Sequence, residues 1–171
     1  AQDRGGGPAG RDGTGIPSSL PCVPGSRTFE AAAFLRRSGA DTGDVKKLFQ
    51  NDLEGTIAKY DIIQNAKMYH EGIAVAKVDH TVGRITAAQA ADELLNISGI
   101  DTSFVLFPDQ EGRVILSARS MGDVNVQVVL EKLGGGGHRT IAGAQLKDAT
   151  MEEAREKLKA MLRQMIEKGE I

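Results

Sequence analysis

The sequence predicts an α/β (α+β) protein in which helices pack on a mixed β-sheet, preceded by a helical connecting segment and a disordered leader. Three observations support this prediction. Runs rich in β-branched and aromatic residues alternate with amphipathic segments of helical period. The 171 residues are 40% hydrophobic and 26% charged, which suffices for one main domain with a buried core. At Ser26 the glycine- and proline-rich composition gives way abruptly to helical periodicity.

Residues 1–25 form the predicted leader. They contain seven glycines and four of the five prolines, with almost no large apolar side chains to offset the entropy lost on ordering. The connector, residues 26–68, is expected to begin with a helix that is capped by Thr28 and ends at Gly39. Two further helices are expected over 42–49 and 53–68, the latter with an apolar stripe of Ile57, Tyr60, Ile62, Ile63 and Ala66.

Residues 69–171 are predicted to form the sheet domain. A strand over 73–78 precedes a helix over 86–97, in which Thr86 and Gln89 have the spacing of a capping box. Two β-rich runs then follow, and the turn-like sequence Pro-Asp-Gln-Glu-Gly between them predicts an antiparallel hairpin over 103–107 and 113–119.

The end of the chain continues this alternation of helices and strands. A short amphipathic helix is expected over 124–133, and the glycines that follow it end the helix. After a strand over 144–147, a long helix is expected over 151–168 with Thr150 as its cap. Its apolar face consists of Ala154, Leu158, Met161, Leu162 and Met165. The element order therefore predicts one sheet with helices packed on it.

Charge and cysteine content exclude several classes of protein. The formal net charge of −2 and the isoelectric point near 6.0 argue against nonspecific electrostatic binding of nucleic acid. A single cysteine, Cys22, excludes an intramolecular disulfide and a cysteine-rich zinc site. No apolar run has the length of a membrane span, so the chain itself is expected to be soluble.

Four consecutive glycines, residues 134–137, are followed by His138. A stable fold tolerates such a run where the chain needs positive φ or a close approach to another group. The spacing fits neither a P-loop nor a dinucleotide-binding fingerprint. Two interpretations remain open: a hairpin or helix C-cap, or a loop whose backbone N–H groups form a phosphate-binding concavity.

Two motifs in this region resemble a known family. Gly-Gly-Gly-His-x-x-x-Ala-Gly over 135–143 follows a short helix, and Ser-Ala-Arg-Ser lies over 117–120. Together they resemble the DHH-associated domain, the carboxy-terminal, substrate-binding half of DHH-family phosphoesterases. Upstream, residues 26–32 and 35–41 resemble the inter-domain segment of bacterial membrane-anchored cyclic-di-AMP phosphodiesterases. Because that likeness begins at Ser26, the leader is interpreted as disordered or non-native.

The resemblance implies a set of substrate-binding residues. Arg119 is expected to bind phosphate through its planar fork, the alternative being a solvated arginine on a strand edge. His138 is expected to donate to phosphate or to stack near a base, the alternative being a structural histidine. Asn125 has the alternative role of a helix cap. The full set is Ser117, Arg119, Ser120, Asn125, Gly134, Gly135, Gly136, Gly137 and His138, with no catalytic or metal-binding residue.

The resemblance also implies a function, namely the substrate-recognition half of a phosphodiesterase that hydrolyses cyclic di-AMP to a linear dinucleotide. The Asp-His-His signature, which in the family helps to hold two divalent metals, is missing. No cofactor is therefore expected in this chain, and manganese is expected in the missing DHH domain. His70 and His80 are interpreted as surface histidines, because an intervening strand separates them. The fragment alone is expected to be inactive.

Partners and location follow from the same resemblance. The expected partners are cyclic di-AMP or the linear dinucleotide, the DHH domain of the parent and, as an option, a second copy of the chain, with no large nucleic acid. The fragment is expected in the cytoplasm, and the parent is expected to be anchored in the cell membrane with this domain facing the cytoplasm. Two alternatives stay open: the recognition half of an oligonucleotide-trimming enzyme or single-strand exonuclease, and a non-enzymatic dimerisation or docking module.

Overall fold

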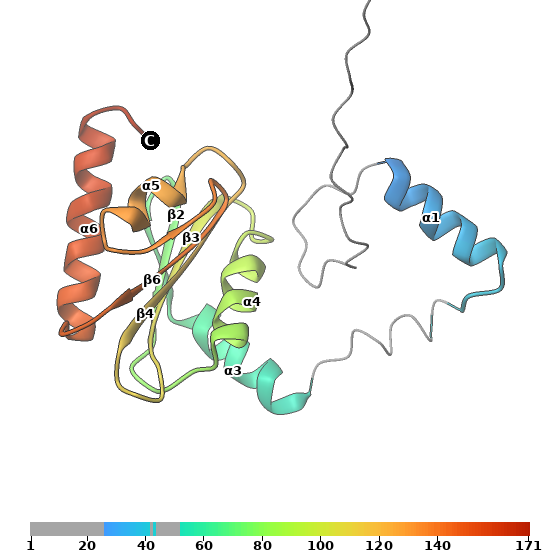
Figure 1. Ribbon diagram of the computed structural model, residues 1–171, viewed down its shortest axis with the longest axis horizontal. Helices are drawn as coiled ribbons and strands as arrows, with labels where there is room; N and C mark the ends of the chain where they lie inside the picture. The colour runs from blue at the N-terminus through green and yellow to red at the C-terminus, as the bar shows by residue number, and fades with distance from the viewer. Residues whose placement is uncertain (1–25, 42, 44–51) are drawn as a thin grey trace, which may run out of the picture.

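A computed structural model describes residues 26–41, 43 and 52–171 (Figure 1). It confirms the predicted fold class, because helices pack on a mixed six-stranded sheet with the strand order β1-β2-β3-β4-β6-β5. The leader and nearly all of the helix expected over 42–49 lie outside the described residues. No helix of the described part is long and apolar enough to cross a membrane.

The sheet is antiparallel except at one pair of strands. Its strands are β1 (Ala66–His70), β2 (Gly72–Lys77), β3 (Ile100–Pro108), β4 (Val114–Ser120), β5 (Gly136–Gly137) and β6 (Ile141–Leu146). The helices are α1 (Ser26–Arg37), α3 (Leu53–Gln64), α4 (Arg84–Leu94), α5 (Val126–Glu131) and α6 (Met151–Glu167). Only β2 and β3 pair in parallel, and α4 lies between them in the chain, as a parallel connection requires.

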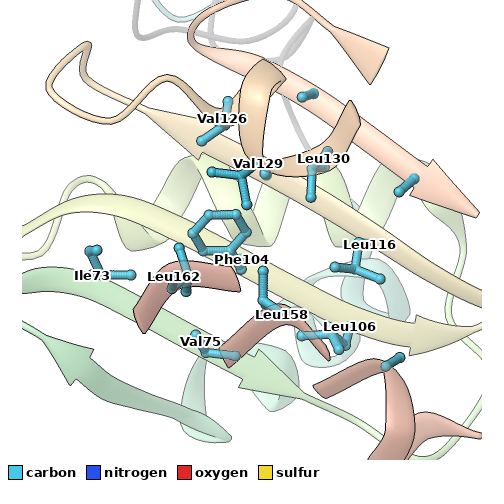
Figure 2. Close-up of a cluster of buried hydrophobic side chains, with 14 of the residues drawn as sticks. Ile73, Val75, Phe104, Leu106, Leu116, Val126, Val129, Leu130, Leu158 and Leu162 are labelled. Carbon is cyan, nitrogen blue, oxygen red and sulfur yellow. The ribbon is translucent and has the colours of Figure 1, made fainter. Parts of the chain in front are cut away.

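Each face of the sheet has its own hydrophobic core. Figure 1 shows α5 and α6 on one side of the sheet and α4 on the other. On the first side, Phe104, Leu158 and Leu162 are fully buried among side chains of the sheet, α5 and α6 (Figure 2). On the second, Ile62 of α3 and Leu94 of α4 are fully buried beside Phe107. Side chains that alternate along each central strand therefore belong to opposite cores.

The hairpin and the last helix were predicted correctly. Strands β3 and β4 pair antiparallel from Thr102 opposite Ser120 to Pro108 opposite Val114. Asp109 closes the turn, because its carboxylate accepts hydrogen bonds from the backbone N–H of Glu111 and of Arg113. Helix α6 starts at the expected cap, where Thr150 and Glu153 form a reciprocal capping box.

The prediction of a helix over 53–68 was wrong in its last turn. The α3 helix ends at Gln64. The Asn65 side chain donates to the Asp61 carbonyl, and residues Ala66–His70 then form the edge strand β1. Pairing with β2 overrides the helical periodicity that continued through Ala66. Two residues of the expected apolar stripe, Ile57 and Tyr60, are exposed rather than buried.

Smaller corrections concern helix starts and strand lengths. Helix α1 begins at Ser26, so Thr28 lies inside it. Helix α4 begins at Arg84 after Gly83, with no side-chain cap, so the expected capping box at Thr86 is wrong. The strand expected over 144–147 begins three residues earlier, at Ile141, because Ile141 and Ala142 pair with β4. Helix α5 is shorter than expected at both ends.

Candidate ligand-binding site

A cavity of about 350 Å³ lies beside the paired ends of β4, β6 and β5. Its floor is apolar and includes Ile115 and Ala142. Polar groups approach it from several elements and are provided by Arg84, Ser117, Arg119 and His138. An apolar pocket with a few convergent polar groups is the usual form of a small-molecule site. The structure therefore brings Ser117, Arg119, Gly136, Gly137 and His138 of the predicted set into one cavity.

A buried ion pair fixes the orientation of Arg119. Its Nε donates to Oδ1 of Asp92 on α4 at 2.8 Å, and the two side chains are 11% and 10% exposed. Its Nη1 donates to the Ser117 hydroxyl at 3.3 Å and to the Ala118 carbonyl at 3.0 Å. Among the described residues, Nη2 has no acceptor within hydrogen-bonding distance. Arg119 therefore reaches the cavity with a fixed guanidinium and one nitrogen available to an anion.

Burial also affects the carboxylate that holds Arg119. Removal from water raises the pKa of Asp92 above its ordinary value, and the charge and hydrogen bond of Arg119 offset this only in part. The pair links β4 to α4, so the position of the guanidinium depends on the packing of that helix.

A row of small residues crosses the strands beside the cavity. Ser117 of β4 lies opposite Gly143 of β6, and Gly143 lies opposite Gly136 of β5. A Cβ atom on Gly136 would meet nothing within 4 Å, and one on Gly143 would meet only a carbonyl at an ordinary 3.5 Å. Packing therefore does not require glycine at either position. The missing side chains instead keep the sheet surface open next to Arg119.

The other glycines of the run are explained by the fold. Gly134, at φ +80°, donates its N–H to the Glu131 carbonyl, and Gly135 donates to the Leu130 carbonyl. These two hydrogen bonds form a Schellman motif that ends α5. A Cβ on Gly135 would collide with the Gly143 carbonyl and Ala144, and one on Gly137 would collide with Ala142. The interpretation as a helix cap and hairpin is thus correct for these three positions.

Three backbone N–H groups of the glycine segment are used within the fold rather than left free for a phosphate. The N–H groups of Gly134 and Gly135 cap α5, and that of His138 donates to the Ile141 carbonyl at 2.7 Å. No helix starts after the glycines, because β5 turns back directly into β6. Of the two interpretations, these hydrogen bonds support the helix cap and hairpin, and Gly136 leaves open space beside the cavity.

The remaining predicted residues lie at different places. His138 is exposed in the turn between β5 and β6 and lines the cavity. Ser120 is buried, outside the lining, and its hydroxyl accepts a hydrogen bond from the Gly122 N–H. Asn125 caps α5 by accepting from the Val128 N–H, which agrees with its alternative role. A substrate contact of Ser120 or Asn125 therefore has no support from this geometry.

Three residues of the site were missed by the sequence interpretation. Asp92 had a recognisable signal, because it is an acid beside the buried positions Ala91 and Leu94 of a predicted helix. Gly143 was noticed as part of a motif but was not assigned to the site. Arg84, whose Nη2 donates to the Gln145 side chain at 3.1 Å, gave no signal because it precedes the expected helix start.

The histidines away from the cavity do not form a metal site. His70 and His80 are both exposed, and Nε2 of His80 lies 3.4 Å from a carboxylate oxygen of Asp61. Within the described ranges, no group of three or more histidine, cysteine, aspartate or glutamate side chains is placed to hold a metal ion.

Comparisons with known proteins identify the family of this chain. The family model of the DHHA1 domain matches residues 70–168, which is more than half of the chain. The chain is 46% identical over 147 residues to the cyclic-di-AMP phosphodiesterase GdpP of Geobacillus thermodenitrificans, covering 85% of this chain and 22% of the relative. It is 43% identical over 136 residues to the cyclic-di-AMP phosphodiesterase PdeA of Listeria monocytogenes, covering 78% and 21%. The chain thus spans about a fifth of the length of these relatives.

A solved structure supports the fold. An exopolyphosphatase-related protein of Bacteroides fragilis superposes with a TM-score of 0.70 at 19% identity, covering 82% of this chain and 44% of that protein. At this level of identity the likeness concerns the fold alone.

Proposed function

Because this chain belongs to the DHHA1 domain family, we propose that it is the substrate-recognition half of a phosphodiesterase that hydrolyses cyclic di-AMP to a linear dinucleotide. The observation that carries the proposal is the cavity that joins Arg119, Arg84, Ser117 and His138 beside an open stretch of sheet. The sequence similarity to two cyclic-di-AMP phosphodiesterases supports the choice of substrate.

In this proposal each residue has a limited role. Nη2 of Arg119 binds a phosphate oxygen, and Arg84 at the cavity edge supplies a second cation. Gly136 and Gly143 leave room for the nucleotide to lie against the sheet. His138 donates to a phosphate oxygen or stacks on a base from the β5–β6 turn. These contacts bind and orient the dinucleotide without reacting with it.

The chemistry belongs to a DHH domain outside this chain. Two divalent metals bound there, usually manganese in the family, supply an activated water and stabilise the leaving oxygen. Among the described residues, no cluster of ligands is placed to hold a metal ion. We also propose that the parent is anchored in the cell membrane with this domain in the cytoplasm.

Calorimetry of the 171-residue chain with cyclic di-AMP tests the proposal. Arg84→Ala is the informative variant, because its side chain is 59% exposed and its removal should leave the fold intact. We expect Arg84→Ala to weaken binding by about fivefold, and Arg119→Ala by about 1.5–3 kcal/mol, the range for hydrogen bonds to charged groups. Lys147→Ala is the matched control, since it removes an exposed cation that does not line the cavity.

The choice of ligand separates the alternatives. Tighter binding of a single-stranded oligonucleotide than of either dinucleotide would favour the recognition half of a nucleic-acid-trimming enzyme. Binding of no nucleotide at all would favour a docking module. If Lys147→Ala weakened the binding of cyclic di-AMP as much as Arg84→Ala does, the ligand would be bound by general electrostatic attraction rather than by this cavity.

A further inference from the structure

A second cleft, of about 480 Å³, lies between the edge strand β1 and helix α6. We call it the β1–α6 cleft and define it by Lys67, Lys77, Arg155, Lys159 and Arg163. It lies on the face of the sheet that packs against α6, because Val75 in its lining belongs to the core under that helix. In the cavity described above, Ser117 and Arg119 share the face of β4 with Ile115, which belongs to the opposite core, and Arg119 pairs with Asp92 of α4 on that side. The two sites are therefore on opposite sides of the sheet.

The cations of this cleft come from three elements and point to one place. Arg155, Lys159 and Arg163 are spaced four residues apart, so they form one stripe along α6. Lys67 on β1 lies opposite Val75, and Lys77 lies two residues further along β2, so both share the face of the sheet toward that stripe. The Tyr69 hydroxyl donates to the Lys159 carbonyl at 2.9 Å and joins β1 to α6 between them.

Two carboxylates that line the cleft, those of Asp79 and Glu156, and that of Glu152 beside it compensate only part of this charge. Asp79 and Glu152 lie 3.1 and 3.3 Å from the Lys77 ammonium, and Glu156 lies 3.3 Å from that of Lys159. Arg155 pairs with Glu152 and Glu156, yet its Nε is buried with no hydrogen-bond partner in the described chain. For Lys67 and Arg163, no carboxylate of the described residues lies within 4.0 Å. Lys67 and Arg163 are therefore the cations that remain available to an anion.

We propose that the β1–α6 cleft binds a small phosphate-bearing anion of about the size of a nucleoside diphosphate. Its volume is within the range of small-molecule sites. Two arginines and three lysines around it favour phosphate oxygens, which accept several charge-assisted hydrogen bonds at once. Tyr69, Val75 and Met68 supply an apolar wall against which the remainder of the ligand lies. The site is independent of the cyclic di-AMP cavity and of its proposed function.

Nuclear magnetic resonance of the full 171-residue chain tests this site. Inorganic pyrophosphate and ADP are the probes, and adenosine is the uncharged comparison. We expect saturable shifts of β1, β2 and α6 amides with both anions, a higher melting temperature in their presence and no response to adenosine. The same shifts should persist in Arg84→Ala, which removes an exposed side chain of the opposite cavity. Affinity should fall as salt is added.

A charge-reversed pair of variants identifies the cleft. Lys67→Glu/Arg163→Glu replaces two exposed cations and should weaken pyrophosphate binding by at least about tenfold. Lys147→Glu/Lys157→Glu makes the same change of net charge at exposed positions outside the cleft. It should bind pyrophosphate as the unsubstituted chain does. Circular dichroism confirms the fold of each variant. Equal weakening in both pairs, or no saturable shift in β1 and α6, would overturn the proposal.

Discussion

At the scale of single residues, Asp92 makes stability depend on pH. Burial raises its pKa above the ordinary value of 3.8, so the folded state binds a proton more tightly than the unfolded state does. The associated stability is fully present below pH 3.8 and is lost as the pH rises through the folded-state pKa. We therefore expect the unfolding free energy of the unsubstituted chain, relative to that of Asp92→Asn, to decrease as the pH rises from 3.5 to 7. Urea unfolding at several pH values measures this, and a constant difference would contradict it.

Asp92 is also expected to act as a positioning residue for Arg119. Asparagine keeps an oxygen that can accept from the Arg119 Nε, whereas alanine leaves that buried guanidinium unpaired. Asp92→Ala should cost about 3 kcal/mol of unfolding free energy and weaken cyclic di-AMP binding by about tenfold. The affinity of Asp92→Asn for cyclic di-AMP should stay within about threefold of that of the unsubstituted chain. If both variants bound alike while remaining folded, Asp92 would have only a structural role.

The residues of the cavity differ in how visible they are in the sequence. Arg119 and His138 were identified because their motif is familiar, and the structure places both at one cavity. Ser120 belongs to the same motif, but strand alternation turns it away from the face that Arg119 shares with Ser117. Arg84 is brought to the cavity by the packing of α4 on the sheet, which no local pattern encodes.

At the scale of elements, the glycine run contains two kinds of position. Alanine at Gly135 would place its Cβ against the Gly143 carbonyl and 2.6 Å from the Ala144 Cβ, so β5 would have to separate from β6. Alanine at Gly136 would meet nothing. We expect Gly135→Ala to lower the unfolding free energy by about 1–3 kcal/mol and Gly136→Ala to change it by less than about 0.5 kcal/mol. Gly136→Ala should instead weaken cyclic di-AMP binding, because its methyl group enters the open row beside Ser117.

Thermal unfolding and calorimetry of the two variants check this distinction. Equal destabilisation would show that the whole run serves the β5–β6 hairpin. Unchanged binding of cyclic di-AMP by a folded Gly136→Ala protein would show that the ligand does not lie against this row of small residues.

Elements with strong local signals were predictable, and those defined by pairing were not. Helix α6 has an apolar face and a capping box, and both features are local. The edge strand β1 has neither a continuous apolar run nor a turn signal, and its extended form depends on hydrogen bonds to β2. β5 consists of two glycines, so only its partner β6 makes it a strand.

At the scale of the whole molecule, binding and hydrolysis are expected to be separable. The sequence lacks the Asp-His-His signature, and the described residues hold no cluster of metal ligands, whereas the hydrolysis that we propose for the longer protein uses two metals. Incubated with manganese and cyclic di-AMP, the chain should therefore produce no linear dinucleotide beyond a protein-free control. Chromatography of the reaction measures this, while calorimetry of the same preparation shows whether the ligand is bound.

A separately produced DHH half provides the positive control. Adding it to the chain should yield linear dinucleotide, and Arg84→Ala should reduce the amount formed. Turnover by the chain alone that survives repurification would show that it carries catalytic groups of its own and is not a recognition domain only.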